Sequence, residues 1–173
     1  MISPTLPPYS SNSSTKVPSL RAPAVLLATW FGAGLSPKAP GTAGSLAALP
    51  FAWGILYGYG VEGLLLATLI VFVIGIWAAR GYTALSGGED PGPVVIDEVA
   101  GQWLTLCVVP LQWQWFLAGF ILFRFFDIIK PWPVGWLDRN IKGATGVMID
   151  DIAAGIYAIL VLYAIDYYLG MPA

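Results

Sequence analysis

Histidine is absent from this 173-residue chain, and cysteine occurs once, as Cys107. No imidazole can therefore act as a general base, a phosphate-accepting nucleophile or a metal ligand. The Ser-His-Asp and Cys-His arrangements of nucleophilic catalysis are excluded, and so is an intramolecular disulfide. Cys107 lies in an apolar run and is interpreted as a small core or lipid-facing residue. Catalysis would have to use carboxylates, lysine, hydroxyls, the lone thiol or a bound metal.

Charged residues are also scarce. They make up 10% of the chain, against 57% hydrophobic residues, whereas an ordinary soluble domain has roughly 25% charged residues. This composition predicts a single-domain integral membrane protein. Most of the ten acidic and eight basic side chains gather in three polar stretches, at residues 36–42, 87–98 and 124–151. Because charge at membrane depth is costly and usually functional, these stretches are the candidate site.

The apolar runs predict an all-α fold, a polytopic membrane helical bundle. Residues 1–22 are expected to form a disordered tail and not a signal peptide, and residues 23–173 the membrane-embedded domain. The run 24–34 is too short to span and is expected to be an interfacial or re-entrant helix. About four spanning helices are expected from the longer runs, at 44–57, 62–79, the pair 99–110 and 113–129, and 151–169. A span needs about 20 residues, so the run 99–110 would span only with residues 94–98 added.

The distribution of charge along these runs predicts their orientation. Threading the chain back and forth through a bilayer places all eight Lys and Arg residues on one side. The three polar stretches fall on the same side, which the positive-inside rule assigns to the cytoplasm. Trp113 and Trp115 fit an aromatic belt at the opposite face.

Two pairs of adjacent carboxylates are candidate metal ligands. Asp97 and Glu98 are expected at one helix start, and Asp150 and Asp151 at another. The alternative to metal binding is that these acids cap the helices and interact with the helix dipole, which is worth ~1 kcal/mol. This alternative explains one acid per helix better than two. Four carboxylates in one pocket would repel one another and favour a divalent cation. Without histidine, the ligand set favours hard cations such as Mg²⁺ or Mn²⁺ over Zn²⁺.

A second group of charges follows a helical spacing. Arg124, Asp127 and Lys130 are three residues apart and would share one helical face. They could form an internal ion-pair ladder. Alternatively, Asp127 is a metal ligand or base, and Arg124 and Lys130 bind phosphate oxygens. Asp138 and Arg139 are expected in an exposed turn, where a surface ion pair is the alternative to a role for Arg139 in substrate binding.

The stretch 36–45 leads into a helix and could bind an anion. Its Gly and Ala residues would let backbone N–H groups approach a phosphate, with Lys38, Thr42 and Ser45 as further donors. The Gly-Lys-Ser/Thr order of a P-loop is absent. A plain helix start with Pro and Gly punctuation explains the stretch equally well.

Several phosphatase mechanisms are excluded by the sequence. A cysteine phosphatase needs Arg six positions after its Cys, and Trp113 stands at that position after Cys107. The Asp-x-Asp triplet of phospho-aspartate enzymes is absent, and histidine-based lipid phosphatases are excluded by composition. Direct attack by a metal-activated water is not excluded.

Three segments, 31–51, 94–106 and 123–155, resemble in the same order the phosphatidylglycerophosphatase A family of bacterial inner membranes. The last of them contains the unusual block KPWP, DR and MIDD. The resemblance implies Mg²⁺-dependent removal of the terminal phosphate from phosphatidylglycerophosphate, which gives phosphatidylglycerol in phospholipid biosynthesis. It also implies a multi-pass protein of the bacterial cell inner membrane, a site facing the cytoplasm and a phospholipid substrate in the bilayer.

The resemblance and the residues together give a site hypothesis. Asp97, Glu98, Asp150 and Asp151 would hold one or two Mg²⁺, with Asp97 and Asp151 counted among the catalytic residues. Asp127 would be a further ligand or would orient the attacking water. The phosphomonoester would be bound by cationic and hydroxyl side chains, namely Lys38, Thr42, Arg124, Lys130 and Arg139.

Other classes of function stay open. A Mg²⁺-dependent transferase acting on a lipid headgroup is the nearest alternative, although the regularly spaced Asp and Gly residues of CDP-alcohol transferases are absent. A transporter or channel would need polar residues inside its spans, and the longer runs have almost none. A purely structural membrane protein would leave the paired acids unexplained. No nucleic-acid partner is expected, and the oligomeric state is open.

Overall fold

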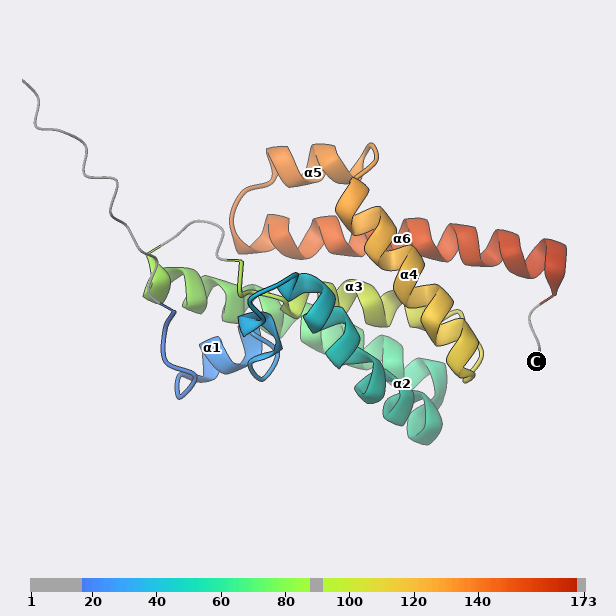
Figure 1. The fold of residues 1–173 in the computed structure, drawn as a ribbon, viewed down its shortest axis with the longest axis horizontal. Helices are drawn as coiled ribbons and strands as arrows, with labels where there is room; N and C mark the ends of the chain where they lie inside the picture. The colour runs from blue at the N-terminus through green and yellow to red at the C-terminus, as the bar shows by residue number, and fades with distance from the viewer. Residues whose placement is uncertain (1–16, 88–91, 171–173) are drawn as a thin grey trace, which may run out of the picture.

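The computed structural model describes residues 17–87 and 92–170, and within them the fold is all-helical (Figure 1). The expected all-α class is therefore confirmed. Most of the expected N-terminal tail, residues 1–16, lies outside the described residues. The elements, in chain order, are α1 (Pro23–Ala28), the short 3₁₀ helix η1 (Ala33–Leu35), α2 (Pro40–Ser86), α3 (Ile96–Leu106), α4 (Trp113–Ile129), α5 (Val134–Asn140) and α6 (Ala144–Leu169).

The expected short helix near the N-terminus is α1, which spans six residues and starts with a proline, the residue type favoured at the first helical position. The chain then turns through positive φ angles at Trp30 and Phe31. The backbone N–H of Val95, just before α3, donates to the carbonyl of Ala28 at 2.8 Å. The hydrogen bond fixes α1 beside the start of α3, and its interfacial placement stays a prediction.

Helix α2 is two helices joined at a break. Gly60 has φ 66° and ψ −165°, a conformation essentially restricted to glycine. The two parts, 40–59 and 61–86, contain the expected runs 44–57 and 62–79. Figure 1 shows the chain turning back at this point, and Ala48 and Ala52 of the first part share a core cluster with Leu64 of the second. Thus α2 forms a helical hairpin.

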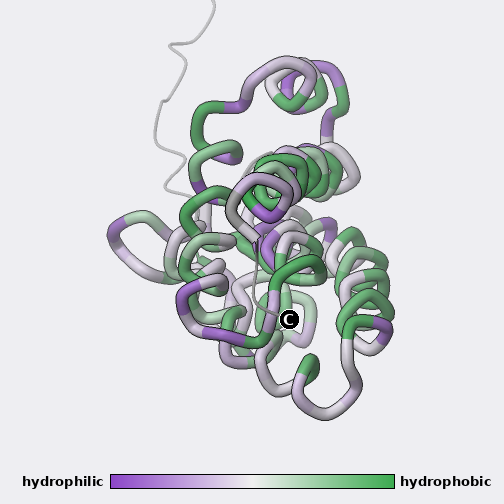
Figure 2. The backbone as a smooth tube through the Cα atoms, turned by 90° about the vertical axis from the view of Figure 1, so that its right-hand side faces the viewer, coloured by the Kyte–Doolittle hydropathy of each residue, from purple (hydrophilic) through white to green (hydrophobic). Residues whose placement is uncertain are grey.

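Two helices are long and apolar enough to cross a membrane by length and composition, namely α2 and Ala144–Tyr168 of α6. Figure 2 shows that the long helices are mostly hydrophobic and that many hydrophilic residues lie at turns and helix ends. With 11 residues, α3 is about 16 Å long and too short to cross alone. The expected number of about four spanning helices is therefore not confirmed.

The second part of α2 exposes large apolar side chains at neighbouring positions, which include Leu65, Leu66, Leu69 and Val73. Exposed apolar patches of this kind mark contact with a partner or a membrane. Together with the two apolar helices, this surface indicates a membrane protein.

Glycines allow α3 to pack directly against α6. A Cβ atom at Gly101 would lie 2.6 Å from the carbonyl oxygen of Asp151, and one at Gly155 would lie 2.8 Å from the carbonyl oxygen of Gly101. Small residues permit this close approach of helices. On its other side, Trp103 of α3 donates its indole N–H to the carbonyl of Ala48 in α2 at 3.0 Å. Helix α3 is therefore held in the centre of the bundle.

The prediction that Asp150 and Asp151 start a helix is wrong. Helix α6 begins at Ala144, after Gly143 with φ 76°, and both acids lie inside it. They are nearly fully buried, with 3% and 4% of their surface exposed. The charged pair looked like a boundary because acids favour helix starts. Capping therefore does not account for these two residues.

The expected exposed turn around Asp138 and Arg139 is instead the short helix α5. Both residues are exposed, as expected. Helix α4 ends at Ile129 because Lys130 has φ 47°, and Pro131 disfavours a helical conformation in the residue before it. Helix α5 was not predicted because Pro131 and Pro133, just before it, are typical of turns.

Candidate active site

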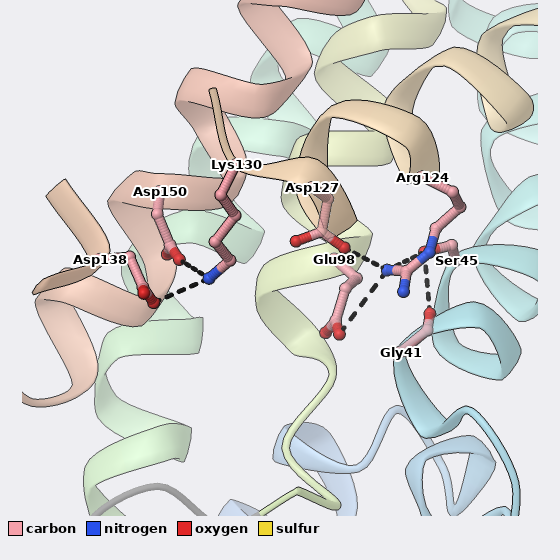
Figure 3. Close-up of polar contacts among 8 residues, drawn as sticks. All are labelled: Gly41, Ser45, Glu98, Arg124, Asp127, Lys130, Asp138 and Asp150. Atoms are coloured by element: carbon pink, nitrogen blue, oxygen red, sulfur yellow. Dashed lines mark hydrogen bonds and ion pairs between the residues drawn. The ribbon is translucent and has the colours of Figure 1, made fainter. Parts of the chain in front are cut away.

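Side chains from four helices meet in one polar pocket of about 180 Å³. The start of α3, the end of α4, α5 and the first part of α6 contribute to it, and Figure 3 shows several of these side chains. The described residues that line the pocket are Gly92, Val94, Asp97, Glu98, Asp127, Lys130, Asp138, Val147, Asp150 and Asp151. The pocket thus combines residues from the second and third polar stretches of the sequence.

Three of the predicted metal ligands come together. Asp97, Glu98 and Asp151 each offer a carboxylate oxygen, and these oxygens lie within 4.8 Å of one another. Asp97 Oδ1, Glu98 Oε2 and Asp151 Oδ2 are buried without a hydrogen-bond partner in the protein. Buried carboxylates without partners are costly unless a cation compensates them. The three residues therefore fit a hard divalent cation such as Mg²⁺.

The local fold explains how these ligands meet. Asp97 and Glu98 occupy the first turn of α3, as predicted. Asp151 reaches them because Gly101, one turn further along α3, allows the backbone of α6 to approach closely. The fourth predicted ligand, Asp150, instead accepts a hydrogen bond from Lys130 Nζ at 2.6 Å.

The electrostatic environment of the α3 acids also favours a cation. Burial, together with the negative charges of Asp151 and Asp127, raises the pKa of Glu98 to about 8, against the opposing effects of a hydrogen bond with Asp97 and of the charge of Arg124. Burial, followed by the charge of Glu98, raises the pKa of Asp97 well above its usual value. A bound divalent cation would reverse these shifts, because it favours the charged form of each acid.

Arg124 contacts two carboxylates from behind the pocket. Its Nη1 donates to Asp127 and lies 3.9 Å from Glu98 Oε1. The same nitrogen lies 3.5 Å from Ser45 Oγ in α2, as Figure 3 shows. Arg124 is not among the described residues that line the pocket. Its guanidinium therefore offsets the charge of two acids that line the pocket, and its role in phosphate binding stays a prediction.

Lys130 is the basic residue among the described pocket-lining residues. Its Nζ donates to Asp138 at 2.7 Å and to Asp150 at 2.6 Å. Burial alone would lower the pKa of Lys130, but the hydrogen bonds to these two acids outweigh burial and raise it. The ladder alternative is only half right: Arg124 pairs with Asp127, whereas the left-handed conformation of Lys130 turns its side chain to α5 and α6.

Three predicted substrate-binding residues lie outside the described lining of the pocket: Lys38, Thr42 and Arg139. Lys38 and Arg139 are exposed, and Thr42 is partly buried in the first turn of α2. None of the three is part of the carboxylate cluster found among the described residues, and their role in phosphate binding stays a prediction.

Sequence reasoning missed two residues of interest. Asp138 was read as a surface residue, and no local pattern links it to Lys130 or Asp150. Gln102 is fully buried, and neither its Oε1 nor its Nε2 has a hydrogen-bond partner in the protein. The sequence did contain a signal for Gln102, because a polar residue stands one turn after Glu98 inside an apolar run.

These features describe an all-helical protein with two candidate membrane helices and a site of buried carboxylates beside a partly exposed lysine. The sequence profile described as Phosphatidylglycerophosphatase A matches residues 26–166, and the chain belongs to this family. The resemblance found in the sequence is thereby confirmed.

The relatives extend over most of the chain. It is 43% identical over 161 residues to the phosphatidylglycerophosphatase A of Haemophilus influenzae, covering 92% of this chain and 99% of the relative. The phosphatidylglycerophosphatase A of Escherichia coli is 44% identical over 144 residues, with 83% of each chain covered. A Bacteroides thetaiotaomicron protein with the provisional name phosphatidylinositol-3-phosphatase is 43% identical over 154 residues, covering 84% of this chain and 95% of the relative. No solved structure matches significantly.

Proposed function

We propose that this protein is a Mg²⁺-dependent phosphatidylglycerophosphatase. It hydrolyses the terminal phosphomonoester of phosphatidylglycerophosphate and gives phosphatidylglycerol and phosphate, a step of phospholipid biosynthesis. The observation that carries the proposal is the meeting of Asp97, Glu98 and Asp151 in a pocket that Lys130 also lines. Membership of the phosphatidylglycerophosphatase A family, with relatives that bear this name, supports the choice of substrate.

The pocket residues divide into metal ligands and phosphate contacts. Asp97, Glu98 and Asp151 would hold Mg²⁺, which when bound acts as a Lewis acid on the phosphoryl group and lowers the pKa of a water molecule. Lys130 contacts the phosphate oxygens in the pocket and offsets their charge. Asp138 and Asp150 hold its ammonium group in place through the two short hydrogen bonds.

Asp127 is assigned to the attacking water. Its Oδ2 accepts a hydrogen bond from Arg124, and the residue lines the pocket. Its other carboxylate oxygen is therefore positioned to orient the water and to take its proton. The water oxygen attacks phosphorus and the bond from phosphorus to the glycerol oxygen breaks. The leaving oxygen takes up the proton that Asp127 removed from the water, so that Asp127 is again a carboxylate.

We also propose a multi-pass topology in the bacterial inner membrane, with the site facing the cytoplasm. The two parts of α2, together with α4 and α6, would make the four spanning helices. Helix α3, with residues 107–112, leads the chain from the site back to the start of α4. Arg80 at the end of α2 donates to Thr145 at the start of α6 at 3.3 Å. Arg80 and Lys142 also line one pocket beside the start of α6, and the positive-inside rule assigns a basic face of this kind to the cytoplasm.

The test is phosphate release by the purified protein in detergent from phosphatidylglycerophosphate, with Mg²⁺ and with EDTA. Release with Mg²⁺ and none with EDTA is the expected result. A parallel assay with phosphatidylinositol 3-phosphate addresses the provisional name of the Bacteroides relative, and faster release from that lipid would change the substrate. No release from either lipid by folded protein in more than one detergent would favour the transferase alternative.

A further inference from the structure

The first turn of α2 packs directly on the carboxylate cluster. A Cβ atom at Gly41 would fall well inside contact distance of Glu98 Oε1 and would lie 3.1 Å from Arg124 Nη1. The Glu98 carboxylate is the end of a flexible side chain, so it could move aside without moving any backbone. A side chain at position 41 would therefore displace this carboxylate while leaving the fold intact.

The displacement matters because the two oxygens of Glu98 have different surroundings. Oε1 lies 3.9 Å from Arg124 Nη1 and against Gly41. Oε2 is buried and has no hydrogen-bond partner in the protein. The contacts of Oε1 set the rotation of the carboxylate, and that rotation sets where Oε2 points relative to Asp97 and Asp151. The backbone of α2 thus controls the geometry of a candidate metal ligand.

Ser45 holds the arginine on the same side. It is fully buried, and its Oγ donates to the carbonyl of Gly41 at 2.9 Å. Because this bond uses the hydroxyl proton, the oxygen is left to accept from Arg124 Nη1, 3.5 Å away. Figure 3 shows the resulting chain of contacts from Gly41 through Ser45 and Arg124 to Glu98 and Asp127.

We propose that Gly41 and Ser45 are positioning residues, which fix the Glu98 carboxylate and the Arg124 guanidinium and do not bind the phosphate. The proposal deepens the proposed function and rests on Glu98 being a metal ligand in it. It concerns Gly41 and Ser45 alone, and phosphate binding by Lys38 and Thr42 of the same stretch stays a separate prediction.

The experiment compares two variants with two matched controls on the same helix. Gly41→Ala adds a methyl group against Glu98, whereas Gly54→Ala adds one where no atom lies within 4 Å. Ser45→Ala removes a buried hydroxyl that reaches Arg124. Thr68→Ala removes a buried hydroxyl whose partners, the carbonyl of Leu64 and the thiol of Cys107, lie outside the described lining of the pocket. The readouts are kcat and KM for phosphatidylglycerophosphate, Mn²⁺ affinity by electron paramagnetic resonance, and unfolding temperature in EDTA.

Residues that orient metal ligands typically change metal affinity or activity by about 10- to 100-fold when mutated. We expect Gly41→Ala and Ser45→Ala to lower kcat and Mn²⁺ affinity within this range, with KM close to that of the wild type. The two controls keep both quantities. Gly41→Ala keeps its unfolding temperature in EDTA, because only the end of a side chain moves.

Two outcomes overturn the proposal. One is wild-type kcat and Mn²⁺ affinity in Gly41→Ala and Ser45→Ala. The other is a raised KM with unchanged kcat and Mn²⁺ affinity, which would mean that this turn binds the phosphate. If Gly41→Ala does not fold, Ser45→Ala decides, because it removes a single oxygen atom. A wild-type protein that binds Mn²⁺ but releases no phosphate contradicts the proposed function alone, and the Mn²⁺ comparison still tests the positioning roles.

Discussion

The residues of the candidate site carry more negative charge than their basic neighbours offset. Acids from α3, α4, α5 and α6 line the pocket together with Lys130, and Arg124 contacts two of the acids from behind. Repulsion among buried carboxylates destabilises the folded state unless a cation is bound. A bound divalent cation should therefore stabilise the folded state, because it offsets the negative charge that Lys130 and Arg124 leave uncompensated.

Neutralising one candidate metal ligand should lower the activity of the protein without lowering its stability. Asp97→Asn and Asp151→Asn keep the shape of the side chain and remove one buried negative charge. We expect phosphate release to fall by more than about 100-fold, the upper end of the effect of residues that only support ligands. The unfolding temperature in EDTA should be equal to or above that of the wild type, because repulsion is reduced. Phosphate release and thermal unfolding in EDTA measure the two effects.

Glu62→Gln is the control for this pair, since Glu62 lies just after the Gly60 break and outside the described lining of the pocket. It should keep wild-type activity. Full activity in either Asp97→Asn or Asp151→Asn would remove that residue from the site.

Substitution of Lys130 should lower activity more than substitution of its exposed partner Asp138. Lys130→Met removes the ammonium group and leaves the buried Asp150 unpaired, so we expect a large loss of activity and a raised KM. Asp138→Asn changes an acid whose side chain is 45% exposed, and exposed ion pairs contribute about 1 kcal/mol or less. Its activity should stay within a few-fold of the wild type. Steady-state kinetics of both variants measures the two losses of activity. A larger loss for Asp138→Asn than for Lys130→Met would contradict the prediction.

Most pocket residues could be found in the sequence because charge in an apolar chain is informative. Asp97, Glu98, Asp150 and Asp151 are predicted as one cluster; Asp97, Glu98 and Asp151 meet, whereas Asp150 pairs with Lys130. The direction of a side chain could not be read in this way. Arg124 contacts Glu98 and Ser45 of other helices because of tertiary packing. Lys130 leaves the helical face because of one positive φ angle.

At the level of whole elements, helix α2 depends on one glycine. Gly60 has φ 66° and ψ −165°, and residues other than glycine pay about 1–3 kcal/mol in such regions. Gly60→Ala should therefore destabilise the protein by this amount. Gly58→Ala is the matched control, because it lies in the same helix with no atom near its Cβ position. Denaturation in detergent compares the two, and equal unfolding curves would contradict the role given to Gly60.

Element bounds were predictable where apolar runs had clear ends. The range 113–129 corresponds to α4, since Pro110 and Pro131 frame it. The start of α6 was misplaced because Ala144 to Ile149 gave no sign of a helix before its acids. Helix α5 was missed because seven residues between prolines and glycine carry too little periodicity to be recognised.

At the scale of the whole molecule, exposed aromatic residues also lie at the end of the helices away from the candidate site. The part of α2 from 40 to 59 is about 30 Å long at 1.5 Å per residue, close to the thickness of the hydrocarbon core. It runs from the turn beside Glu98 to Tyr57 and Tyr59, which are 82% and 77% exposed. Trp113, at the start of α4, is 66% exposed and lines a groove with Trp53. Such rings favour the membrane–water interface.

This polarity predicts the orientation of the chain. Cys107 is buried and is the one cysteine in the sequence, so Cys107→Ala gives a background for single cysteines. In that background, Tyr59→Cys and Trp113→Cys should react with a membrane-impermeant maleimide added to intact cells. Lys142 lies with Arg80 in a groove at the start of α6, on the face that the proposed topology assigns to the cytoplasm. Lys142→Cys should therefore react only in inside-out vesicles. Labelling of Lys142→Cys in intact cells would contradict the proposed orientation, because it would place the start of α6 outside the cytoplasm.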